Sequence, residues 1–309
     1  MIHVIDVQSR ATIQDLGRFG LRRFGISQCG AMDKLALRAG NILLGNAEDA
    51  PAIEVPLGGI TLKFQQDMNF CVTGAFYEMT LDDKPVFAYW RYQARAGQVL
   101  KMARARIGMY GYLCVQGGIL LPKELNSCST YLRAQIGGIE GRGLQAGDQL
   151  QTVNDPILRG EIGIAPIPLK HTIHALPSSE YQAFKRKSQY YWWRGKWTLQ
   201  SSSDRMGYRF QGQKLELKQP LEMLSHAIQF GSVQVPPSGQ PIILMADAQT
   251  TGGYPKIANV IDADLGALAQ VRLGSTIQFE AVNLEQAAKL RRKNEIYLDQ
   301  IRRIVDEKN

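Results

Sequence analysis

The sequence of 309 residues predicts a mainly β fold of the α+β class with a few helices. Short apolar runs bounded by turn residues recur along the whole chain, whereas only two stretches have the period of an amphipathic helix. A glycine turn that opens a short strand also occurs three times, at 96–100, 146–150 and 273–277. Such turns are typical of the corners of a β-barrel.

The expected strands begin at the N-terminus. Residues 1–7 alternate apolar and polar side chains, which favours a half-buried first strand. Asp82-Asp83-Lys84-Pro85 has the composition of a hairpin connection between two later runs. The remaining strand candidates are 60–64, 70–73, 79–81, 86–90, 99–102, 112–115, 198–200, 214–217, 233–235 and 242–245.

Two helices are expected. Asp33 is suited to cap the first, because its carboxylate can accept hydrogen bonds from the first turn, and Gly45 can close that helix. Asn283, with Gln286 three residues later, forms a capping pattern for a C-terminal helix over 284–305. The predicted apolar stripe of the C-terminal helix consists of Ala287, Leu290, Tyr297, Ile301 and Ile304.

The length of the chain favours two domains, because it exceeds that of a typical single domain. Residues 155–170 are rich in Pro, Gly and Ile and have no clear period. We therefore place the boundary there, with an N-terminal domain over 1–160 and a C-terminal domain over 161–309 that includes the C-terminal helix.

The composition favours a soluble, cytoplasmic protein. No apolar run is long enough to span a bilayer, and the N-terminus lacks the charged and apolar regions of a signal peptide. The four cysteines form no Cys-x-x-Cys pair, which favours reduced thiols. The net charge of +8 and the run Tyr190-Tyr191-Trp192-Trp193-Arg194 superficially suit nucleic acid. A packed face with snorkelling basic side chains is the favoured interpretation, so neither nucleic acid nor a membrane is an expected partner.

The sequence lacks the residue patterns of several common functional sites. No glycine run is followed by Lys-Ser or Lys-Thr, so the sequence has no P-loop. His171 and His174 have no further ligand in matching register, and no metal is expected. Val99-Leu100-Lys101-Met102 lacks the first methionine of a biotin-acceptor sequence, so no covalent biotin is expected. Cys29 and Cys128 have no adjacent histidine and are not assigned as nucleophiles.

The densest polar segment, residues 246–256, follows an apolar run over 241–245 that we interpret as a buried strand. A plain turn requires only glycine and proline, so the number of polar groups favours a ligand site over a loop that caps its own backbone. The chemistry-bearing residues of the segment are Asp247, Gln249, Thr250, Thr251, Gly252, Gly253, Tyr254 and Lys256.

Two more regions are similarly dense: residues 201–212, which contain Arg205-Met206-Gly207-Tyr208-Arg209, and residues 12–18 with 27–33. Together with Gln249-Thr250-Thr251-Gly252-Gly253-Tyr254-Pro255 they resemble the carboxyltransferase-like family. This family includes the second subunit of allophanate-hydrolase-type systems, the carboxyltransferase region of urea carboxylase and the C subunit of bacterial ATP-dependent 5-oxoprolinases. The resemblance covers nearly the whole chain and is strongest to the 5-oxoprolinase branch, through Ser27-Gln28-Cys29-Gly30, Ser127-Cys128-Ser129 and Leu224-Ser225-His226.

The resemblance implies two cyclophilin-like β-barrel domains. It also implies a subunit of an ATP-dependent hydrolase that converts 5-oxoproline to glutamate. The expected partners are the B subunit of that enzyme, in a tight heteromer, and its A subunit, so the chain is expected to be inactive alone. ATP is expected at the complex, and whether it contacts this chain is left open.

On this interpretation the chemistry of the site is electrostatic. Arg205 would clamp an anionic group by bidentate hydrogen bonds, and Asp247 would orient either this arginine or a substrate N–H. Tyr254 and Lys256 would stabilise charge that develops on the amide oxygen of a lactam. His226 is either an acid or base or a structural residue.

Further residues are expected to read the substrate. Gln249, Thr250 and Thr251 would hydrogen-bond to the amide edge of the lactam. An unstrained lactam resists hydrolysis because its resonance must be broken, so coupling to ATP through phosphorylation of the amide oxygen makes chemical sense. The other expected substrate-binding residues are Gln14, Asp15, Asp33, Tyr208, Gly252 and Gly253.

Two other functions stay open at this stage. One is the carboxyltransferase component of a biotin-dependent urea carboxylase, although no carboxylase or biotinyl domain is attached. The other is a regulatory protein that binds an inhibitor of a kinase, because a relative within the family acts in that way.

Overall fold

The computed structural model describes residues 1–308, and these divide into two compact units. Unit 1 comprises residues 1–18, 29–168 and 294–308, and unit 2 comprises residues 19–28 and 169–293. Each unit is therefore built from segments that are separate in the sequence. The predicted domain limits at 160 and 161 stay a prediction, because compact units need not coincide with domains.

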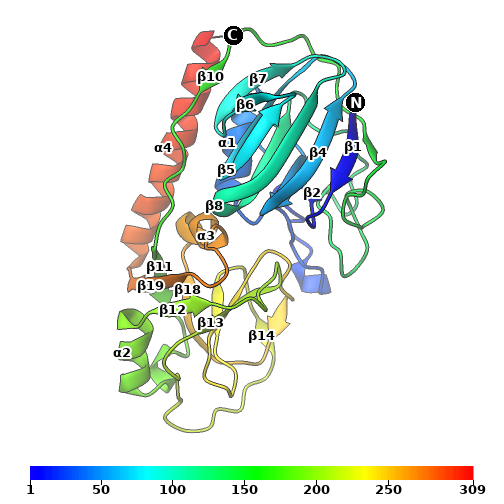
Figure 1. Cartoon of the computed structure of the whole chain (residues 1–309). Coiled ribbons are helices and arrows are strands. Elements are labelled where there is room, and N and C mark those ends of the chain that lie inside the picture. Colours follow the sequence, from blue (N-terminus) through cyan, green and yellow to red (C-terminus); the bar gives the residue numbers. More distant parts are fainter. Residues whose placement is uncertain (309) are drawn as a thin grey trace. The chain divides into compact units, whose positions relative to one another are not determined.

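Unit 1 is a ten-stranded sheet in which β10, β7, β5, β8, β4, β1 and β9 are neighbours in that order. Figure 1 shows the central strands of this sheet side by side. The longest pair is antiparallel, β5 with β8, and runs from Phe70 opposite Val115 to Leu81 opposite Leu100. In addition, β3 pairs with both β2 and β8, and β6 pairs with β5. The bounds are β1 Ile2–Val7, β2 Thr12–Gln14, β3 Ala52–Pro56, β4 Gly58–Phe64, β5 Met68–Leu81, β6 Lys84–Val86, β7 Trp90–Ala94, β8 Val99–Val115, β9 Gln149–Leu150 and β10 Ile162–Gly163.

Helix α1 (Lys34–Leu43) packs closely on this sheet. Its predicted cap is confirmed, because the side chain of Asp33 accepts a hydrogen bond from the backbone N–H of Ala36 at 3.1 Å. Gly40 allows the close approach, since a Cβ there would lie 2.7 Å from the sulfur of Cys114 and 2.9 Å from the hydroxyl of Thr73. Any larger residue at position 40 would push the helix off the sheet.

Unit 2 is a closed barrel with the strand order β11, β18, β15, β16, β13, β12, β19, and β14 and β17 form a separate pair. Large side chains that fill the interior of unit 2, such as Trp192, Trp197 and Phe279, have at most 1% of their surface exposed. The strand bounds are β11 Thr172–Pro177, β12 Trp197–Leu199, β13 Gly207–Gln211, β14 His226–Ala227, β15 Ser232–Gln234, β16 Ile242–Leu244, β17 Thr251–Gly252, β18 Lys256–Val260 and β19 Thr276–Ala281. The helices are α2 Arg186–Arg194, α3 Asp262–Ala269, and the 3-10 turns η1 Arg22–Phe24 and η2 Tyr181–Ala183.

Helix α4 (Leu284–Lys308) is the predicted C-terminal helix, and the division between the units falls within it. Its capping pattern is confirmed: Asn283 and Gln286 exchange two hydrogen bonds of 2.8 Å between side chain and backbone. The predicted apolar stripe is confirmed at Ile301 and wrong at Ile304, and its other three residues are only partly buried. The buried positions are Leu298, Ile301 and Val305, whereas Ile304 is 37% exposed.

The predicted mainly β fold with a C-terminal helix is confirmed, and so are the three glycine turns, where Gly97, Gly147 and Gly274 have φ of 91°, 95° and 82°. Several strand limits need correction. The runs 70–73 and 79–81 belong to the single strand β5, and 99–102 and 112–115 belong to β8, because bulges let these strands bend without a turn. The run 86–90 is not a single strand, because Val86 ends β6 and Trp90 begins β7. Residues 214–217 form no strand but a single bridge from Leu217 to Phe184.

Helices α2 and α3 were not predicted. Across residues 1–308, no helix combines the length and the apolar character that crossing a membrane requires.

Candidate functional site

The polar segment over 246–256 leaves the barrel of unit 2 directly after β16, as the sequence predicts. Neighbouring backbone holds its first residues: the N–H of Met245 donates to the carbonyl of Met206, and the N–H of Asp247 donates to the carbonyl of Arg205 at 2.9 Å. The hydroxyl of Ser27 donates to the carbonyl of Ala248 at 2.9 Å. Three motifs that are far apart in the sequence therefore meet within unit 2.

Arg205 and Asp247 form a bidentate ion pair. The Nε and Nη2 groups of Arg205 donate to the two carboxylate oxygens of Asp247 at 2.9 and 2.8 Å. The two side chains are 14% and 8% exposed, so solvent screens the pair little. The geometry agrees with the idea that Asp247 orients the arginine.

The middle of the segment joins a short strand pair. In β17, Thr251 lies opposite Ala227 and Gly252 lies opposite His226 of β14. The carbonyl of Thr250 accepts from the N–H of Ile228 at 3.1 Å, and the residue is 8% exposed. The side chains of Gln249 and Thr251 are exposed and so are accessible to a ligand.

Gly252 is required by a close contact that the sequence did not reveal. A Cβ at this position would lie 2.5 Å from Nε2 of Gln234, a residue of β15 that is only 3% exposed. Within residues 1–308, Nε2 of Gln234 is a buried donor with no hydrogen-bond acceptor. An unsatisfied buried amide is costly, so Gln234 is a candidate ligand donor that sequence patterning missed.

Lys256, at the end of the segment, is held in a cluster of three ionisable residues. Its ammonium group contacts Nε2 of His226 and lies 3.3 Å from a carboxylate oxygen of Glu180. The same carboxylate oxygen accepts from the backbone N–H of Lys256 at 3.1 Å. Lys256 is 9% exposed, so its charge acts in a poorly screened environment.

The pKa of Glu180 reports this environment. Burial raises it, but the hydrogen bonds from Ser179 and from the backbone of Lys256, together with the charge of Lys256, outweigh burial. The net pKa of Glu180 lies below its ordinary value. Glu180 therefore remains a carboxylate that fixes the ammonium group of Lys256.

A cavity of about 650 Å³ adjoins the end of the segment. Gly253, Tyr254 and Pro255 form part of its wall, and Lys214 and Lys218 line it as well. The phenol of Tyr254 is 47% exposed, which leaves it accessible from this cavity. A cavity of this size is in the range that holds small ligands.

In unit 1, the predicted residue Asp15 organises a buried loop. Its carboxylate accepts hydrogen bonds from the hydroxyls of Ser127 and Ser129 at 2.7 and 2.5 Å. It also accepts from the backbone N–H groups of Gly17 and Cys128 at 2.7 and 2.6 Å. Because four donors of the chain bind its two oxygens, the carboxylate of Asp15 holds this loop together.

Three buried polar atoms lie around that loop without a partner among the described residues: Oε1 of Gln14, Nη1 of Arg18 and Oγ1 of Thr130. Gly138 lies close to one of them, since a Cβ there would lie 2.0 Å from Oγ1 of Thr130. Gln14, a predicted site residue, also donates to the carbonyl of Thr130 at 3.1 Å. The sequence did not single out Arg18 or Thr130.

The other two predicted residues have structural contacts. The backbone N–H of Asp33 donates to the hydroxyl of Tyr112 at 2.7 Å, while its side chain caps α1. Tyr208 is fully buried, and its hydroxyl donates to the carbonyl of Ala269 at 2.9 Å. Several predicted site residues of the segment 246–256 have exposed side chains, whereas the side chains of Gln14, Asp15 and Asp33 in unit 1 are buried.

The two thiols considered as nucleophiles are buried, Cys29 with 1% and Cys128 with 2% of its surface exposed. Burial and the neighbouring charge of Asp15 raise the pKa of Cys128. A buried thiol is a poor nucleophile, and for this reason neither cysteine is assigned to the chemistry.

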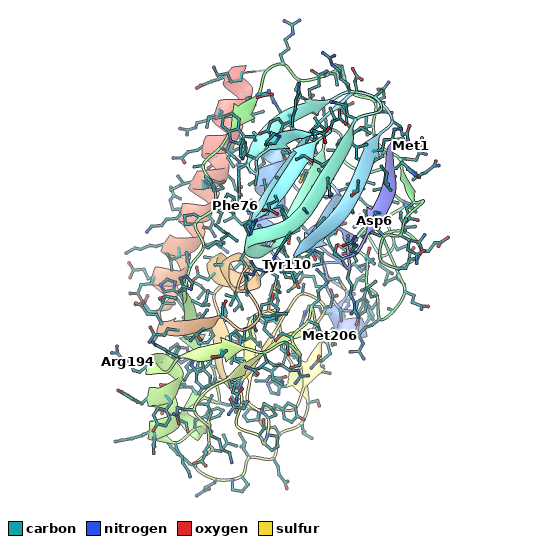
Figure 2. The ribbon with its side chains drawn as sticks, in the orientation of Figure 1. Met1, Asp6, Phe76, Tyr110, Arg194 and Met206 are labelled. Carbon is teal, nitrogen blue, oxygen red and sulfur yellow. The ribbon has the colours of Figure 1, made fainter. Side chains whose placement is uncertain are left out.

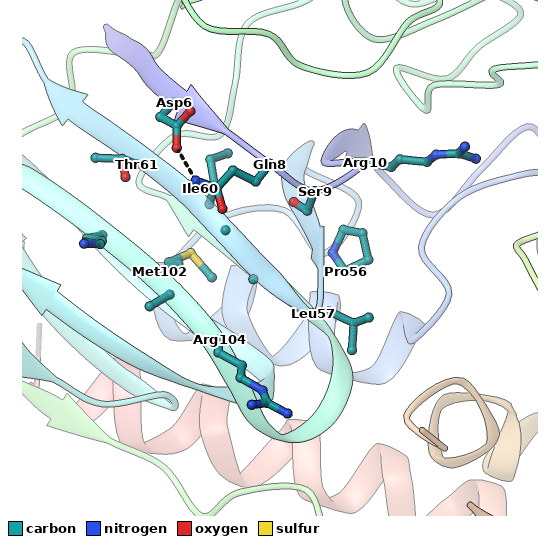
Figure 3. Close-up of a pocket in the computed structure, with 14 residues that line it drawn as sticks. Asp6, Gln8, Ser9, Arg10, Pro56, Leu57, Ile60, Thr61, Met102 and Arg104 are labelled. Atoms are coloured by element: carbon teal, nitrogen blue, oxygen red, sulfur yellow. Dashed lines mark hydrogen bonds between the residues drawn. The ribbon is translucent and has the colours of Figure 1, made fainter. Parts of the chain in front are cut away.

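Unit 1 also has a surface cavity of about 670 Å³ between β1, β4 and β8, shown in Figure 3. Asp6 and Gln8 share a hydrogen bond of 3.1 Å at one side of it, and Arg10 and Arg104 lie at other positions around it. Lys101, the lysine of the biotin-acceptor-like run, lines this cavity within the exposed part of β8. None of the predicted site residues lines it.

Comparisons with known proteins agree with the sequence motifs. The family described as carboxyltransferase domain, subdomain A and B, matches residues 24–281. The chain is 89% identical over 309 residues to the C subunit of the 5-oxoprolinase of Haemophilus influenzae, with full coverage of both chains. It is 47% identical to the C subunit of the 5-oxoprolinase of Escherichia coli (strain K12), with 97% of each chain covered.

The fold is also similar to that of solved structures. The crystal structure of the Kluyveromyces lactis urea carboxylase matches with a TM-score of 0.90 at 26% identity. That match covers 97% of this chain but only 29% of the urea carboxylase. The fold thus occurs as a part of a much larger enzyme.

Proposed function

The chain belongs to the carboxyltransferase domain family, subdomain A and B, and from this premise we propose that it is the C subunit of an ATP-dependent 5-oxoprolinase. The substrate is 5-oxo-L-proline and the product is L-glutamate. The observation that carries the proposal is the segment 246–256, which has the Arg205–Asp247 ion pair at one end and the Lys256 cluster at the other. Full-length relatives of this name support it.

The reaction adds one water across the ring amide. A C–O bond forms, the C–N bond breaks, and the nitrogen leaves as the amine of glutamate after it takes a proton. Loss of amide resonance is the costly step, so groups that stabilise charge on the amide oxygen or protonate the nitrogen lower the barrier. Turnover of ATP supplies the driving force.

The residues of unit 2 fit these tasks. The ammonium group of Lys256, fixed by Glu180, stabilises charge on the amide oxygen, and the phenol of Tyr254 approaches from the adjoining cavity. His226, in contact with that ammonium group, moves the proton. The carboxamide and hydroxyls of Gln249, Thr250 and Thr251 read the edge of the lactam.

The ion pair at the other end of the segment acts differently from the first expectation. Since the guanidinium of Arg205 already holds Asp247 through two hydrogen bonds, its role is to position the segment, and any contact with the substrate carboxylate is additional. The expected cytoplasmic location and the partnership with the A and B subunits complete the proposal.

A carboxyltransferase role in a urea carboxylase is the second candidate, and the similarity in fold to the Kluyveromyces lactis enzyme favours it. The identity to the two 5-oxoprolinase subunits is higher, which favours the first proposal.

The experiment is an assay of ATP turnover with 5-oxoproline or urea as substrate. It compares this chain alone, with the B subunit, and with the A and B subunits together. The proposal predicts turnover that depends on 5-oxoproline only when the partners are present. Robust turnover by the single chain, or turnover that requires urea, bicarbonate and biotin, would contradict it.

A further inference from the structure

A cavity of about 870 Å³ lies in unit 2, and none of the residues assigned to the lactam lines it. Helix α2 forms one wall, strand β19 another, and Tyr181 of η2 and Thr172 of β11 close the rest. Its size is in the range that holds a cofactor-sized ligand. Three residues of the aromatic and basic run that stood out in the sequence, Tyr190, Trp193 and Arg194, therefore line a cavity.

One stripe of α2 faces this cavity. The residues Arg186, Gln189, Tyr190, Trp193 and Arg194 line it and are spaced at i, i+3, i+4, i+7 and i+8, which places them on one side of a helix. The buried face of the helix carries other residues, Ser188 and Trp192. Core packing thus accounts for the second face, whereas Arg186, Tyr190 and Arg194 on the first face are exposed.

The aromatic wall is held in place before any ligand arrives. The indole N–H of Trp193 donates to the hydroxyl of Tyr181 at 2.9 Å, and the two ring centroids are 6.2 Å apart. The side chain of Gln189 donates to the carbonyls of Tyr181 and Phe184 at 3.0 and 3.1 Å, which fixes the turn that carries Tyr181. Tyr190 is 64% exposed and offers a second ring. Rings that are already fixed lose little entropy when a planar ligand stacks on them.

The charge of the cavity is predominantly positive. Arg186 and Arg194 line it at opposite ends of α2, and the helix itself contains no acidic residue. Figure 2 places Arg194 at the outer edge of unit 2, where its side chain is accessible. Guanidinium groups bind phosphate by paired hydrogen bonds.

Among the described residues that line the cavity, Glu280 of β19 is the single carboxylate. Its side chain is 64% exposed, and one of its oxygens lies 4.0 Å from Nε2 of His174. In dinucleotide sites a carboxylate accepts hydrogen bonds from the ribose hydroxyls, and Glu280 can serve in this way.

We propose that this cavity binds a nucleoside phosphate. The base stacks on the rings of Trp193 and Tyr190, the ribose lies at Glu280, and the phosphates lie at Arg186 and Arg194. Such a site needs no P-loop, so its absence from the sequence is no obstacle. That the nucleotide is ATP rests on the proposed function; the site itself rests on the cavity and its lining.

The cavity and the lactam segment are connected through η2. Glu180, which fixes Lys256, precedes Tyr181, which lines the cavity, directly in the sequence. A ligand in the cavity that moves Tyr181 would therefore also change the position of Glu180, which binds Lys256. This linkage is a reason to expect ATP and 5-oxoproline to influence each other's binding.

The test is calorimetric titration of the full-length chain with ATP, adenosine and inorganic tripolyphosphate as separate probes. We expect ATP to bind with micromolar to submillimolar affinity and more tightly than either half. Arg186→Ala and Arg194→Ala should each weaken ATP binding roughly tenfold and leave adenosine binding within about twofold. Tyr190→Ala should weaken ATP and adenosine but not tripolyphosphate.

Lys196→Ala is the matched control, because it removes one exposed positive charge just beyond α2 and does not line the cavity. Its ATP affinity should stay within about twofold of the unmodified chain, since exposed charges outside the contact are screened. All variants change exposed side chains, and their melting temperatures verify folding.

Three outcomes would overturn the proposal: no ATP binding at millimolar concentration, equal losses in Lys196→Ala and the arginine variants, or tripolyphosphate binding as tight as ATP and unaffected by Tyr190→Ala. The assay of the assembled enzyme separates the two proposals. Turnover dependent on 5-oxoproline without ATP binding to this chain refutes the site and spares the proposed function, whereas binding without such turnover does the opposite.

Discussion

Replacement of Arg205 by lysine tests how the segment over 246–256 is held. The change keeps the positive charge but cannot reproduce the two parallel hydrogen bonds of 2.9 and 2.8 Å to Asp247. We therefore expect Arg205→Lys to lower the free energy of unfolding of unit 2 and to lower activity in the assembled enzyme.

The magnitude follows from the number of bonds lost and from their burial. A hydrogen bond to a charged group contributes about 1.5–3 kcal/mol to stability, and one of the two is lost. Exposed ion pairs contribute about 0–1 kcal/mol, and breaking a buried one costs about 3–5 kcal/mol. With side chains only 14% and 8% exposed, the Arg205–Asp247 pair lies near the buried limit. A loss of about 1.5–3 kcal/mol corresponds to roughly a ten- to hundredfold decrease in kcat/KM if the transition state needs the segment in place.

The assay is urea unfolding followed by tryptophan fluorescence, with kcat/KM measured on the same preparations. Three of the four tryptophans, Trp192, Trp193 and Trp197, lie in unit 2, so fluorescence reports mainly on this unit. Arg209→Lys, an exposed position on β13, is the matched control and should change stability by less than about 0.5 kcal/mol. An unfolding curve for Arg205→Lys that coincides with that of the unmodified chain would refute the reasoning.

Further substitutions test other parts of the structure. Cys29→Ser and Cys128→Ser should each keep most of the activity, because neither buried thiol is assigned to the chemistry; loss of turnover with a covalent adduct at sulfur, seen by mass spectrometry, would overturn this. Gln249→Ala should lower kcat/KM by roughly ten- to hundredfold at an unchanged melting temperature, since its side chain is exposed and, on the proposed function, reads the lactam; a parallel fall in melting temperature would assign it to scaffolding. Asp264→Asn should cost about 2–4 kcal/mol in urea unfolding, because this fully buried carboxylate accepts from a lysine ammonium at 2.6 Å and a histidine backbone N–H at 2.8 Å. Because the pKa of Glu180 is lower in the folded chain, its carboxylate stabilises the fold above about pH 4.5, and this stabilisation is lost as the pH falls through the folded pKa. On acidification, Glu180→Gln should therefore lose less free energy of unfolding than the unmodified chain. Equal losses would contradict the assigned ionisation.

The sequence predicted those elements whose signals are local. Asp33 and Asn283 cap their helices because capping depends on a side chain and the next three residues. Gly97 and its two counterparts turn the chain because their positive φ is costly for other residues. By contrast, α2 was missed because its two buried residues, Ser188 and Trp192, leave a short aromatic helix without a recognisable apolar stripe.

The site could be predicted only in part for a similar reason. The residue types around 246–256 were recognisable, and so was the link between Arg205 and Asp247. The roles of Glu180 and Gln234 depend on strands that are distant in sequence, β18 and β15, and single-sequence patterning has no access to such contacts. Tyr208 belongs to a motif that resembles the family, yet it is buried and its hydroxyl donates to the carbonyl of Ala269 at the end of α3.

The discontinuous composition of the two units affects how the chain can be made. Residues 294–308 are translated after all of unit 2, yet within unit 1 they provide Glu295, which binds Arg38 by two hydrogen bonds of 2.8 and 2.9 Å, and the buried Leu298 and Ile301. Residues 19–28 emerge early but must wait for unit 2, where Ser27 binds the carbonyl of Ala248. Unit 1 therefore cannot complete its packing before residues 294–308 have been synthesised, which is after the residues of unit 2. A cut at any single point between residues 160 and 170 leaves an N-terminal fragment without Leu298 and Ile301 and a C-terminal fragment without the contact from Ser27.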